Sequence, residues 1–227
     1  MEQCRNGNDH IKYNSIGVNM IVRVGLPWLR KVRPQVTADT LAALRAYDKT
    51  KIDFQIVEVG GTHCVRGRNI SSMEKPFDGY APVRQRLSYD YYLSIDDDMG
   101  FIPETIERLI AADKDVIGAS YMNRDGDASV IVAMPLNAKN KEDKFKVWEH
   151  GLKECLWTGG GCILIKKQVF EALDYPWWRN NIVYVKDANG VLFSEVMTED
   201  VSFCEEARKM GYKIWVDLDN RVVHIPT

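Results

Sequence analysis

The chain has 227 residues, 45% of them hydrophobic, which is enough to bury a sizeable core in one domain. Its 30 basic and 32 acidic residues nearly cancel, so no strongly basic surface is available to attract nucleic acid. No apolar run approaches the roughly 20 residues that a membrane helix needs, and we expect no transmembrane segment.

The cysteines suggest a reducing compartment. They are odd in number, scattered, and form no CxxC pair, which argues against a zinc ribbon or a disulfide scaffold. A cytoplasmic location is the simplest interpretation. Residues 1–14 are polar and lack the apolar core of a signal peptide. We expect them to be a tail or lead-in of a single domain that spans residues 1–227.

Strand and helix patterns alternate in the first half of the chain. We expect a strand over residues 15–24, a helix with Thr37 as its N-cap, and a second strand over residues 53–59. Residues 66–69 then read as a loop, and residues 70–88 as partly helical. This alternation is typical of βαβ units, so the sequence predicts an α/β fold with a mostly parallel sheet flanked by helices.

A third strand pattern ends abruptly in Asp96, Asp97 and Asp98. In open α/β sheets, ligands bind at the carboxyl ends of strands, where water or a cation can neutralise adjacent carboxylates. Mg²⁺ and Mn²⁺ prefer such oxygen ligands and leave positions open for substrate phosphates. One interpretation is therefore a metal site for a phosphorylated ligand. The other is an acidic surface turn, because Asp commonly caps turns.

The second half of the chain is less regular, with polar loops between residues 122 and 154. We expect a helix that begins at Pro103, a buried strand over 115–121 and a short strand near 130–134. A glycine turn then leads into a strand at 162–165, followed by a helix containing Val169, Phe170 and Leu173 and by an irregular aromatic segment over 175–189. The last expected elements are a helix from Thr198 to about Met210, ended by Gly211, and strands over 213–217 and 221–224.

Two acidic residues and one histidine join the Asp run as candidates. Glu199 and Asp200 start a predicted helix, where acidic side chains complement the helix dipole, but a carboxylate there can also act as a general base. His224 ends an apolar strand. It is either a satisfied structural residue or, as a neutral imidazole, a ligand that completes a carboxylate-bound metal site.

Two further stretches suit a phosphorylated nucleotide. Arg66 and Arg68 can pair with phosphate, and Asn69 can read a base or ribose edge, although all three also suit a solvated loop. The glycines at 159–161 indicate either a tight turn or a close approach of the backbone to a ligand.

The order of these features resembles the GT-A type, family two-like glycosyltransferases, which use nucleotide sugars and have one Rossmann-like domain. The resemblance covers roughly residues 57–224. The matching stretches are Arg68-Asn69, Tyr92-Leu93-Ser94-Ile95-Asp96-Asp97-Asp98, Gly159-Gly160-Gly161-Cys162-Ile163-Leu164-Ile165, Glu199-Asp200-Val201-Ser202-Phe203-Cys204, Gly211-Tyr212-Lys213-Ile214-Trp215-Val216-Asp217 and His224.

The resemblance implies a metal-dependent transfer of one sugar from a nucleotide-diphosphate sugar to a hydroxyl of a glycan or other acceptor, with inversion and with Asp200 as the base. It implies Mn²⁺ or Mg²⁺ as cofactor. By the same resemblance, the nucleotide is expected at Arg66, Arg68, Asn69 and Asp96, the metal at Asp96, Asp98 and His224, and the donor or acceptor sugar at Glu199, Gly160, Gly161 and Trp157. The absence of a Gln-x-x-Arg-Trp element favours single-sugar transfer over processive synthesis.

Two other functions remain open. A nucleotidyltransferase also uses carboxylates and Mg²⁺, but it should carry a glycine-rich basic loop after the first strand, and the chain has only Gly25 there. A catalytically silent module would bind a sugar or nucleotide without needing Asp200. We expect the neighbouring Trp177 and Trp178 to pack in the core or in a lid over 175–197 rather than to stack on a sugar.

Overall fold

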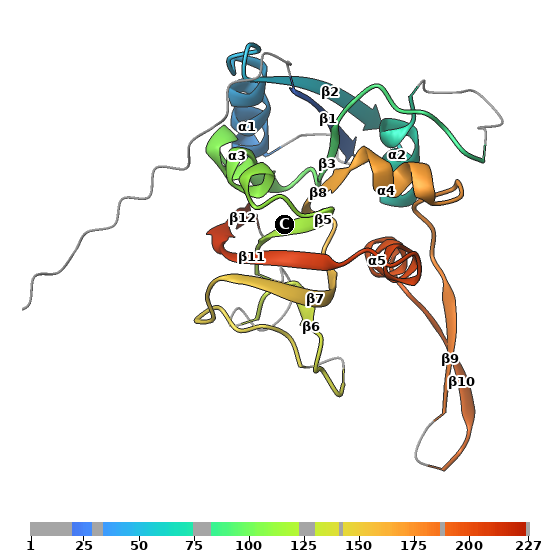
Figure 1. Ribbon diagram of the computed structural model, residues 1–227. Helices are drawn as coiled ribbons and strands as arrows, with labels where there is room; N and C mark the ends of the chain where they lie inside the picture. The colour runs from blue at the N-terminus through green and yellow to red at the C-terminus, as the bar shows by residue number, and fades with distance from the viewer. Residues whose placement is uncertain are drawn as a thin grey trace, which may run out of the picture.

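The computed structural model describes residues 20–28, 34–74, 83–122, 130–140, 143–186 and 189–225 of the chain. These residues form a mixed α/β structure around an eight-stranded sheet (Figure 1). The expected tail at residues 1–14 and residues 15–19 of the expected first strand lie outside this part of the chain.

The first half of the chain supplies alternating strands and helices, as expected. Strand β1 pairs in parallel with both β2 and β3. The elements are β1 (Met20–Trp28), α1 (Gln35–Arg45), β2 (Ile52–Gly60), α2 (Cys64–Ser72), β3 (Tyr91–Ile95), α3 (Pro103–Ala111) and β5 (Val116–Ser120).

The second half completes the same sheet. Strand β8 lies antiparallel between β3 and β5, and β7 lies antiparallel between β11 and β6, so the other six strands all run in one direction. The order across the sheet is β2-β1-β3-β8-β5-β11-β7-β6. The added elements are β6 (Ala133–Pro135), β7 (Leu152–Thr158), β8 (Cys162–Lys166), α4 (Lys167–Ala172), α5 (Glu199–Lys209) and β11 (Ile214–Arg221).

Alternating residues of the central strands point into two separate hydrophobic cores. On β3, Tyr92 joins a core with Phe170 and Phe203 from α4 and α5. Its neighbour Leu93 joins a second core with Leu41 from α1, and Ile106 of α3 lies there too. This follows from the pleat of a strand, which points successive side chains to opposite faces. The sheet therefore has apolar cores on both faces, in agreement with the predicted α/β class.

Two small sheets lie outside the main one. Strand β4 (Met99–Gly100) pairs antiparallel with β12 (Val223–His224), which brings the end of the described chain beside the Asp run. Strands β9 (Ile182–Lys186) and β10 (Leu192–Val196) form an antiparallel hairpin that projects from the body (Figure 1). The sequence prediction of an irregular segment over residues 175–189 is therefore wrong for residues 182–186.

Two other local predictions are wrong. Helix α1 begins at Gln35 after Pro34, so Thr37 is inside the helix and is not its N-cap. Thr37 is buried, and its hydroxyl donates instead to the carbonyls of Met99 and Asp97, at 2.9 and 3.2 Å. Residues 66–69 are not a loop but belong to helix α2, which ends at Ser72.

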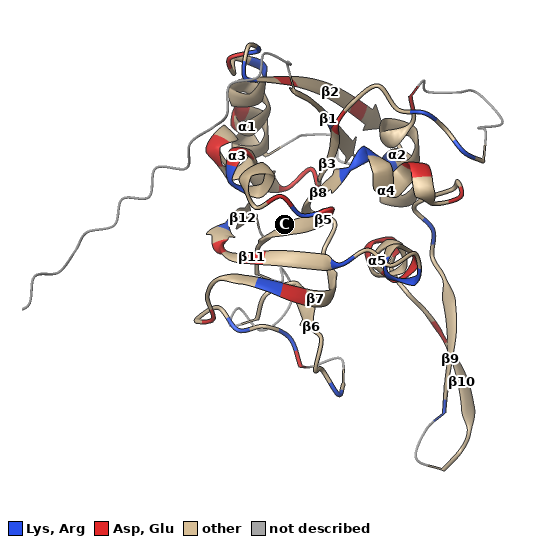
Figure 2. Cartoon of the chain, viewed as in Figure 1, with Lys and Arg blue, Asp and Glu red and all other residues tan. Residues whose placement is uncertain are grey.

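Several helix boundaries agree with the sequence. Pro103 opens α3, and Thr198 is the N-cap residue of α5. Gly211, just beyond α5, has φ of +91°, a conformation that favours glycine. Both signs of charge are interspersed over α3, α4 and α5 (Figure 2), in keeping with the near-zero net charge. None of the described helices has the length and apolar content needed to cross a membrane.

Candidate functional site

The Asp run lies where β3 ends, as the sequence predicts, and three neighbouring segments hold it there. The amide of Asp96 donates to the carbonyl of Gly161 at 3.1 Å. Thr37 in α1 donates to the carbonyls on either side of Asp98. The amide of Ile225 donates to the carbonyl of Asp98 at 3.0 Å. The backbone of the run is thus fixed by residues far away in the sequence.

His224 comes beside Asp98 through the pairing of β12 with β4. Its Nε2 lies 3.5 Å from Oδ1 of Asp98, and its Nδ1 lies 3.0 Å from the carbonyl of Met122. The side chains are 15% exposed for His224 and 5% for Asp98. The carboxylate of Asp98 raises the pKa of His224, although partial burial acts in the opposite direction. The structure therefore brings together two of the three predicted metal ligands.

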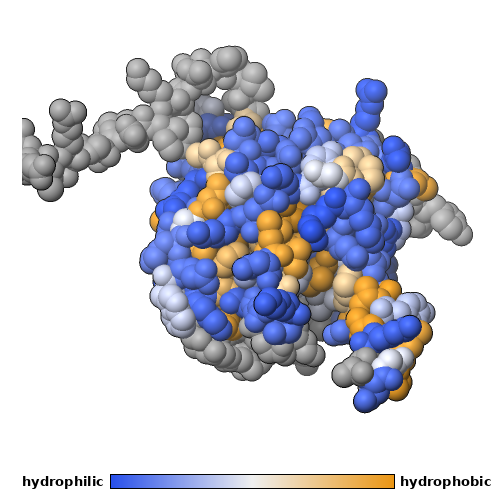
Figure 3. Space-filling model, turned by 60° about the horizontal axis from the view of Figure 1, so that its bottom comes forward, coloured by the Kyte–Doolittle hydropathy of each residue, from blue (hydrophilic) through white to orange (hydrophobic). Residues whose placement is uncertain are grey.

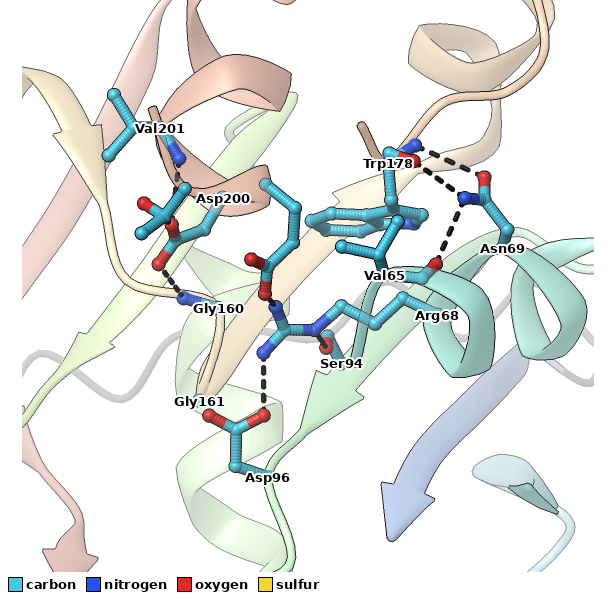
Figure 4. Close-up of polar contacts among 12 residues, drawn as sticks. Val65, Arg68, Asn69, Ser94, Asp96, Gly160, Gly161, Trp178, Asp200 and Val201 are labelled. Carbon is cyan, nitrogen blue, oxygen red and sulfur yellow. Dashed lines mark hydrogen bonds and ion pairs between the residues drawn. The ribbon is translucent and has the colours of Figure 1, made fainter. Parts of the chain in front are cut away.

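Arg68 is the buried centre of a charge cluster, which we call the Arg68 cluster: Arg68, Ser94, Asp96 and Glu199 (Figure 4). The side chain of Asp96 is the most open of the four, at 35% exposed. The guanidinium donates from Nε to the hydroxyl of Ser94 at 3.0 Å and from Nη2 to Asp96 at 2.5 Å. Its third nitrogen, Nη1, donates to Glu199. Its Cζ also lies 5.4 Å from the centre of the Trp178 ring, within range of a cation–π contact.

The charges in this cluster depend on one another. Burial alone would lower the pKa of Arg68, but the carboxylates of Asp96 and Glu199 outweigh it and hold the pKa above its ordinary value. Loss of water raises the pKa of Asp96, although the Arg68 guanidinium acts to lower it. One cation thus serves two carboxylates, while Asp98 and Asp200 add further negative charge nearby.

Glu199 and Asp200 are neighbours on α5 but have different surroundings. Glu199 is buried and faces Arg68, so its carboxylate lies inside the protein rather than at a site open to an acceptor. Asp200 is half-buried, and its Oδ2 accepts from the amide of Gly160 at 3.1 Å. Its Oδ1 accepts from Thr198 and from the amide of Val201, at 2.5 and 2.9 Å (Figure 4). Asp200 is therefore held in place by short local contacts.

The glycine turn at residues 159–161 approaches other protein groups closely. A β-carbon on Gly160 would lie 2.7 Å from Cζ of Arg68, and one on Gly159 would overlap the hydroxyl of Tyr121. The amide of Gly161 donates to that hydroxyl at 3.0 Å. These contacts account for glycine at both positions without a ligand. The predicted role of Gly160 and Gly161 at a sugar stays a prediction.

The residues predicted to touch the nucleotide have unequal positions. Arg66 is exposed on α2, whereas Arg68 and Asn69 are buried. The side-chain Nδ2 of Asn69 donates to the backbone carbonyls of Val65 and Trp178 at 2.9 and 2.6 Å, and its Oδ1 accepts from the backbone amide of Trp178 at 3.1 Å. Protein contacts alone therefore explain the conformations of Arg68 and Asn69, and their predicted role at a nucleotide stays a prediction.

The tryptophans are part of the packing. Trp177 and Trp178 are buried, and Trp178 stacks on Phe203 with ring centres 4.5 Å apart. This agrees with core packing and leaves no face of Trp178 for a sugar. Trp157 is partly buried on β7, with Nζ of Lys144 lying 5.7 Å from its ring centre. Its predicted contact with a sugar stays a prediction.

The residues around Asp98 suit a divalent cation only when a ligand supplies further oxygens. Within the described ranges, no group of three or more His, Cys, Asp or Glu side chains is arranged to hold a metal. Mg²⁺ is commonly bound through one or two carboxylates plus substrate phosphates, at about 2.0–2.1 Å. Two ligand atoms at adjacent corners of such an octahedron lie roughly 3 Å apart. The 3.5 Å between Asp98 and His224 is close to that spacing.

Three residues that the sequence did not assign to the site shape it. Ser94 lies on β3 and binds Arg68, Trp178 covers the guanidinium, and Tyr121 at the end of β5 binds the glycine turn. Tyr121 also packs against His224, with ring centres 5.4 Å apart. Burial raises the pKa of Tyr121, and the carboxylates of Asp96 and Asp200 add to the rise. The sequence did indicate one of the three residues, because Tyr121 lies at the carboxyl end of a predicted strand, where ligand sites form in open α/β sheets.

Comparisons with known proteins bear on the fold alone. No protein-family model matches the chain, and its sequence matches none of the curated proteins. Among solved structures, 27 chains match. One is titled "Crystal Structure of A197 from STIV"; it has a TM-score of 0.54 and 15% sequence identity, over 92% of this chain and 95% of that chain. At this identity the likeness concerns the fold alone.

Proposed function

We propose that the protein is a metal-dependent, GT-A type glycosyltransferase that moves one sugar from a nucleotide-diphosphate sugar to an acceptor hydroxyl. The observation that carries the proposal is the gathering of Asp96, Asp98, Asp200 and His224 around the carboxyl end of β3. These side chains come from three distant parts of the sequence. Ligand sites in open α/β sheets form at such an edge.

The donor's diphosphate is the chemical reason for a cation at this edge. Asp98 and His224 would hold Mn²⁺ or Mg²⁺, with Asp96 close to the same position. When bound, the cation neutralises negative charge that develops on the leaving diphosphate. The surplus of carboxylates over guanidinium groups around Asp96 favours attraction of a divalent cation.

Asp200 is the proposed base. Its carboxylate takes the proton from the acceptor hydroxyl while the oxygen forms a bond to the anomeric carbon and the bond to the diphosphate breaks. The amide of Gly160 and the hydroxyl of Thr198 hold this carboxylate at the start of α5. A single displacement of this kind inverts the anomeric centre.

Glu199 is better suited to a positioning role than to the acceptor contact expected from the sequence. Its carboxylate binds Arg68, which also binds Asp96, so the start of α5 is tied to the end of β3. This link supports a defined separation between Asp200 and the cation site. We also propose that the protein is cytoplasmic and that the acceptor hydroxyl belongs to a glycan or to another molecule.

A panel of nucleotide sugars, each incubated with Mn²⁺ and with EDTA, tests the proposed function. We expect one donor to release its nucleoside diphosphate in the presence of Mn²⁺ only, with slow hydrolysis when no acceptor is present. Release of pyrophosphate would instead identify a nucleotidyltransferase. Metal-dependent binding without turnover, in the presence of a broad set of acceptors, would favour a silent binding module.

A further inference from the structure

The β9–β10 hairpin, which we call the arm (residues 182–186 and 189–196), exposes an unusual amount of apolar surface. Figure 3 shows apolar residues on it at the lower right of the view. Six large apolar side chains on its strands are between 45% and 69% exposed: Ile182, Tyr184, Val185, Leu192, Phe193 and Val196. Surfaces of this kind commonly mark a binding interface.

The apolar residues occupy both faces of the arm. Tyr184 pairs with Ser194, and the next pair along the ladder is Val185 with Phe193. Successive pairs of an antiparallel ladder point to opposite faces, so Tyr184 and Phe193 lie on different sides. Packing of one side against the body would leave the other side exposed to water.

The base of the arm is firmly attached. The amide of Met197 donates to the carbonyl of Asn181 at 2.9 Å, which closes the hairpin. The amide of Asn181 donates to Ser202 on α5 at 3.0 Å, and its side chain donates to Glu206 at 3.1 Å. The arm therefore leaves the body in a direction set by α5, immediately before Glu199 and Asp200.

We propose that the arm is a dimerisation element and that its partner is the arm of a second copy of this chain. An isolated two-stranded hairpin is at best marginally stable in water, and three or more strands are needed for independent stability. Within the described residues, β9 and β10 pair only with each other, so each has an outer edge on which a further strand can add.

The size and charge of the arm fit this partner. Its six exposed apolar side chains are divided between two faces, with Ile182, Tyr184, Leu192 and Val196 on one face and Val185 and Phe193 on the other. The face with four of them is the larger apolar surface for a second arm to cover. The described strands of the arm carry one Lys and one Glu, Lys186 and Glu195, so two arms repel each other little. Figure 2 shows one blue and one red segment on the described strands of the arm, and the rest of these strands in tan.

A lipid bilayer is a poorer partner for the same surface. Open strand edges cannot satisfy their backbone hydrogen bonds in hydrocarbon, whereas a second hairpin supplies those bonds. The arm also lacks a cluster of Lys or Arg that would attract anionic lipid headgroups. A second copy therefore accounts for the open edges and for one apolar face of the arm.

The oligomeric state of the full chain, measured by sedimentation velocity over a range of concentrations, tests the proposal. We expect a dimer for the wild type. The double variant Tyr184→Ser/Phe193→Ser changes both faces and should weaken the dimer by at least roughly 30-fold, the effect of losing one interface hot spot. Trp148→Ser is the control, because Trp148 is 64% exposed outside the arm and should leave the dimer unchanged.

A second measurement uses the wild type alone and so does not depend on the folding of a variant. Hydrogen exchange at the amides of residues 182–186 and 192–196 should accelerate when the protein is diluted, while the amides of β3 should not change. A wild type that is monomeric at all concentrations overturns the proposal. So does a double variant that folds and still forms the dimer, or a monomer that binds phosphatidylcholine vesicles through the arm.

Discussion

The Arg68 cluster and the Asp98–His224 pair lie at the same edge of the sheet, yet the protein neutralises their charges in different ways. In the cluster, one buried guanidinium donates to two carboxylates, a hydroxyl and an aromatic face. In the pair, one carboxylate faces one imidazole at 3.5 Å, which is longer than an ordinary hydrogen bond.

This difference separates a positioning role from a binding role. The guanidinium of Arg68 already donates to strong partners. A ligand that drew the guanidinium away from them would leave Asp96 and Glu199 without their cation. Removing one partner of a buried ion pair costs about 3–5 kcal/mol, so such an exchange is unfavourable. The looser contact of Asp98 with His224 is cheaper to replace by a cation bound to both residues.

The largest effect should come from Asp200, which follows Glu199 of the Arg68 cluster on α5. We expect Asp200→Asn to fold normally and bind the donor, but to lose roughly 10²–10⁴ in turnover, the usual contribution of a general base. Glu199→Gln is the matched neighbour. It should lower thermal stability, because it weakens a buried ion pair, whereas Asp200→Asn should not. Turnover near the wild-type rate for Asp200→Asn would remove it from the role of base.

Removal of the Arg68 guanidinium is the next largest change. Arg68→Met keeps much of the volume but leaves the buried carboxylate of Glu199 without its cation, so we expect a loss of about 3–5 kcal/mol in the free energy of unfolding, measured by urea denaturation. Asp96 is 35% exposed and adds less to this loss. The control is Arg84→Met. Arg84 and its partner Asp174 are 67% and 61% exposed, and exposed pairs contribute about 0–1 kcal/mol. Equal losses of unfolding free energy in Arg68→Met and Arg84→Met would contradict the proposal that Arg68 stabilises the site.

A smaller effect should follow from a methyl group on the glycine turn. In Gly160→Ala the new β-carbon lies 2.7 Å from Cζ of Arg68, whose guanidinium is held by three partners and has little room to move. We expect a cost of about 1–3 kcal/mol in stability, typical of overpacking. In the Arg68→Met background the same substitution should cost less, because the clash is gone. If the losses in unfolding free energy from the two single substitutions simply add in the double variant, the two residues act independently.

The local patterns of the sequence predicted the strand that carries the Asp run, the helix after Thr198 and the glycine that ends it. These features depend on neighbouring residues. The Arg68 cluster does not: Arg68 lies 131 positions from Glu199 along the chain. Residues 66–69 resemble a loop because Gly and Asn are poor helix formers, and tertiary contacts of Arg68 and Asn69 override that preference.

The arm could have been predicted. Asn189-Gly190 is a strong hairpin signal, and it lies between two β-branched and aromatic runs. Gly190 has φ of +81°, as a turn glycine often does. The sequence predicts a short strand over residues 221–224 and a possible ligand role for His224, but Asp98 as its partner was expected from the family resemblance, because nothing local indicates that β12 pairs with the two-residue strand β4.

The most direct test of the proposed function is calorimetry of nucleoside diphosphate binding to two neighbouring variants, with Mn²⁺ and with EDTA. Asp98→Asn and Asp97→Asn remove the same charge from the same run. We predict that Asp97→Asn keeps Mn²⁺-dependent binding. Asp98→Asn should lose more than the roughly 10–100-fold that a change next to a metal ligand costs. Unchanged Mn²⁺-dependent affinity in Asp98→Asn would contradict a metal site at Asp98 and His224.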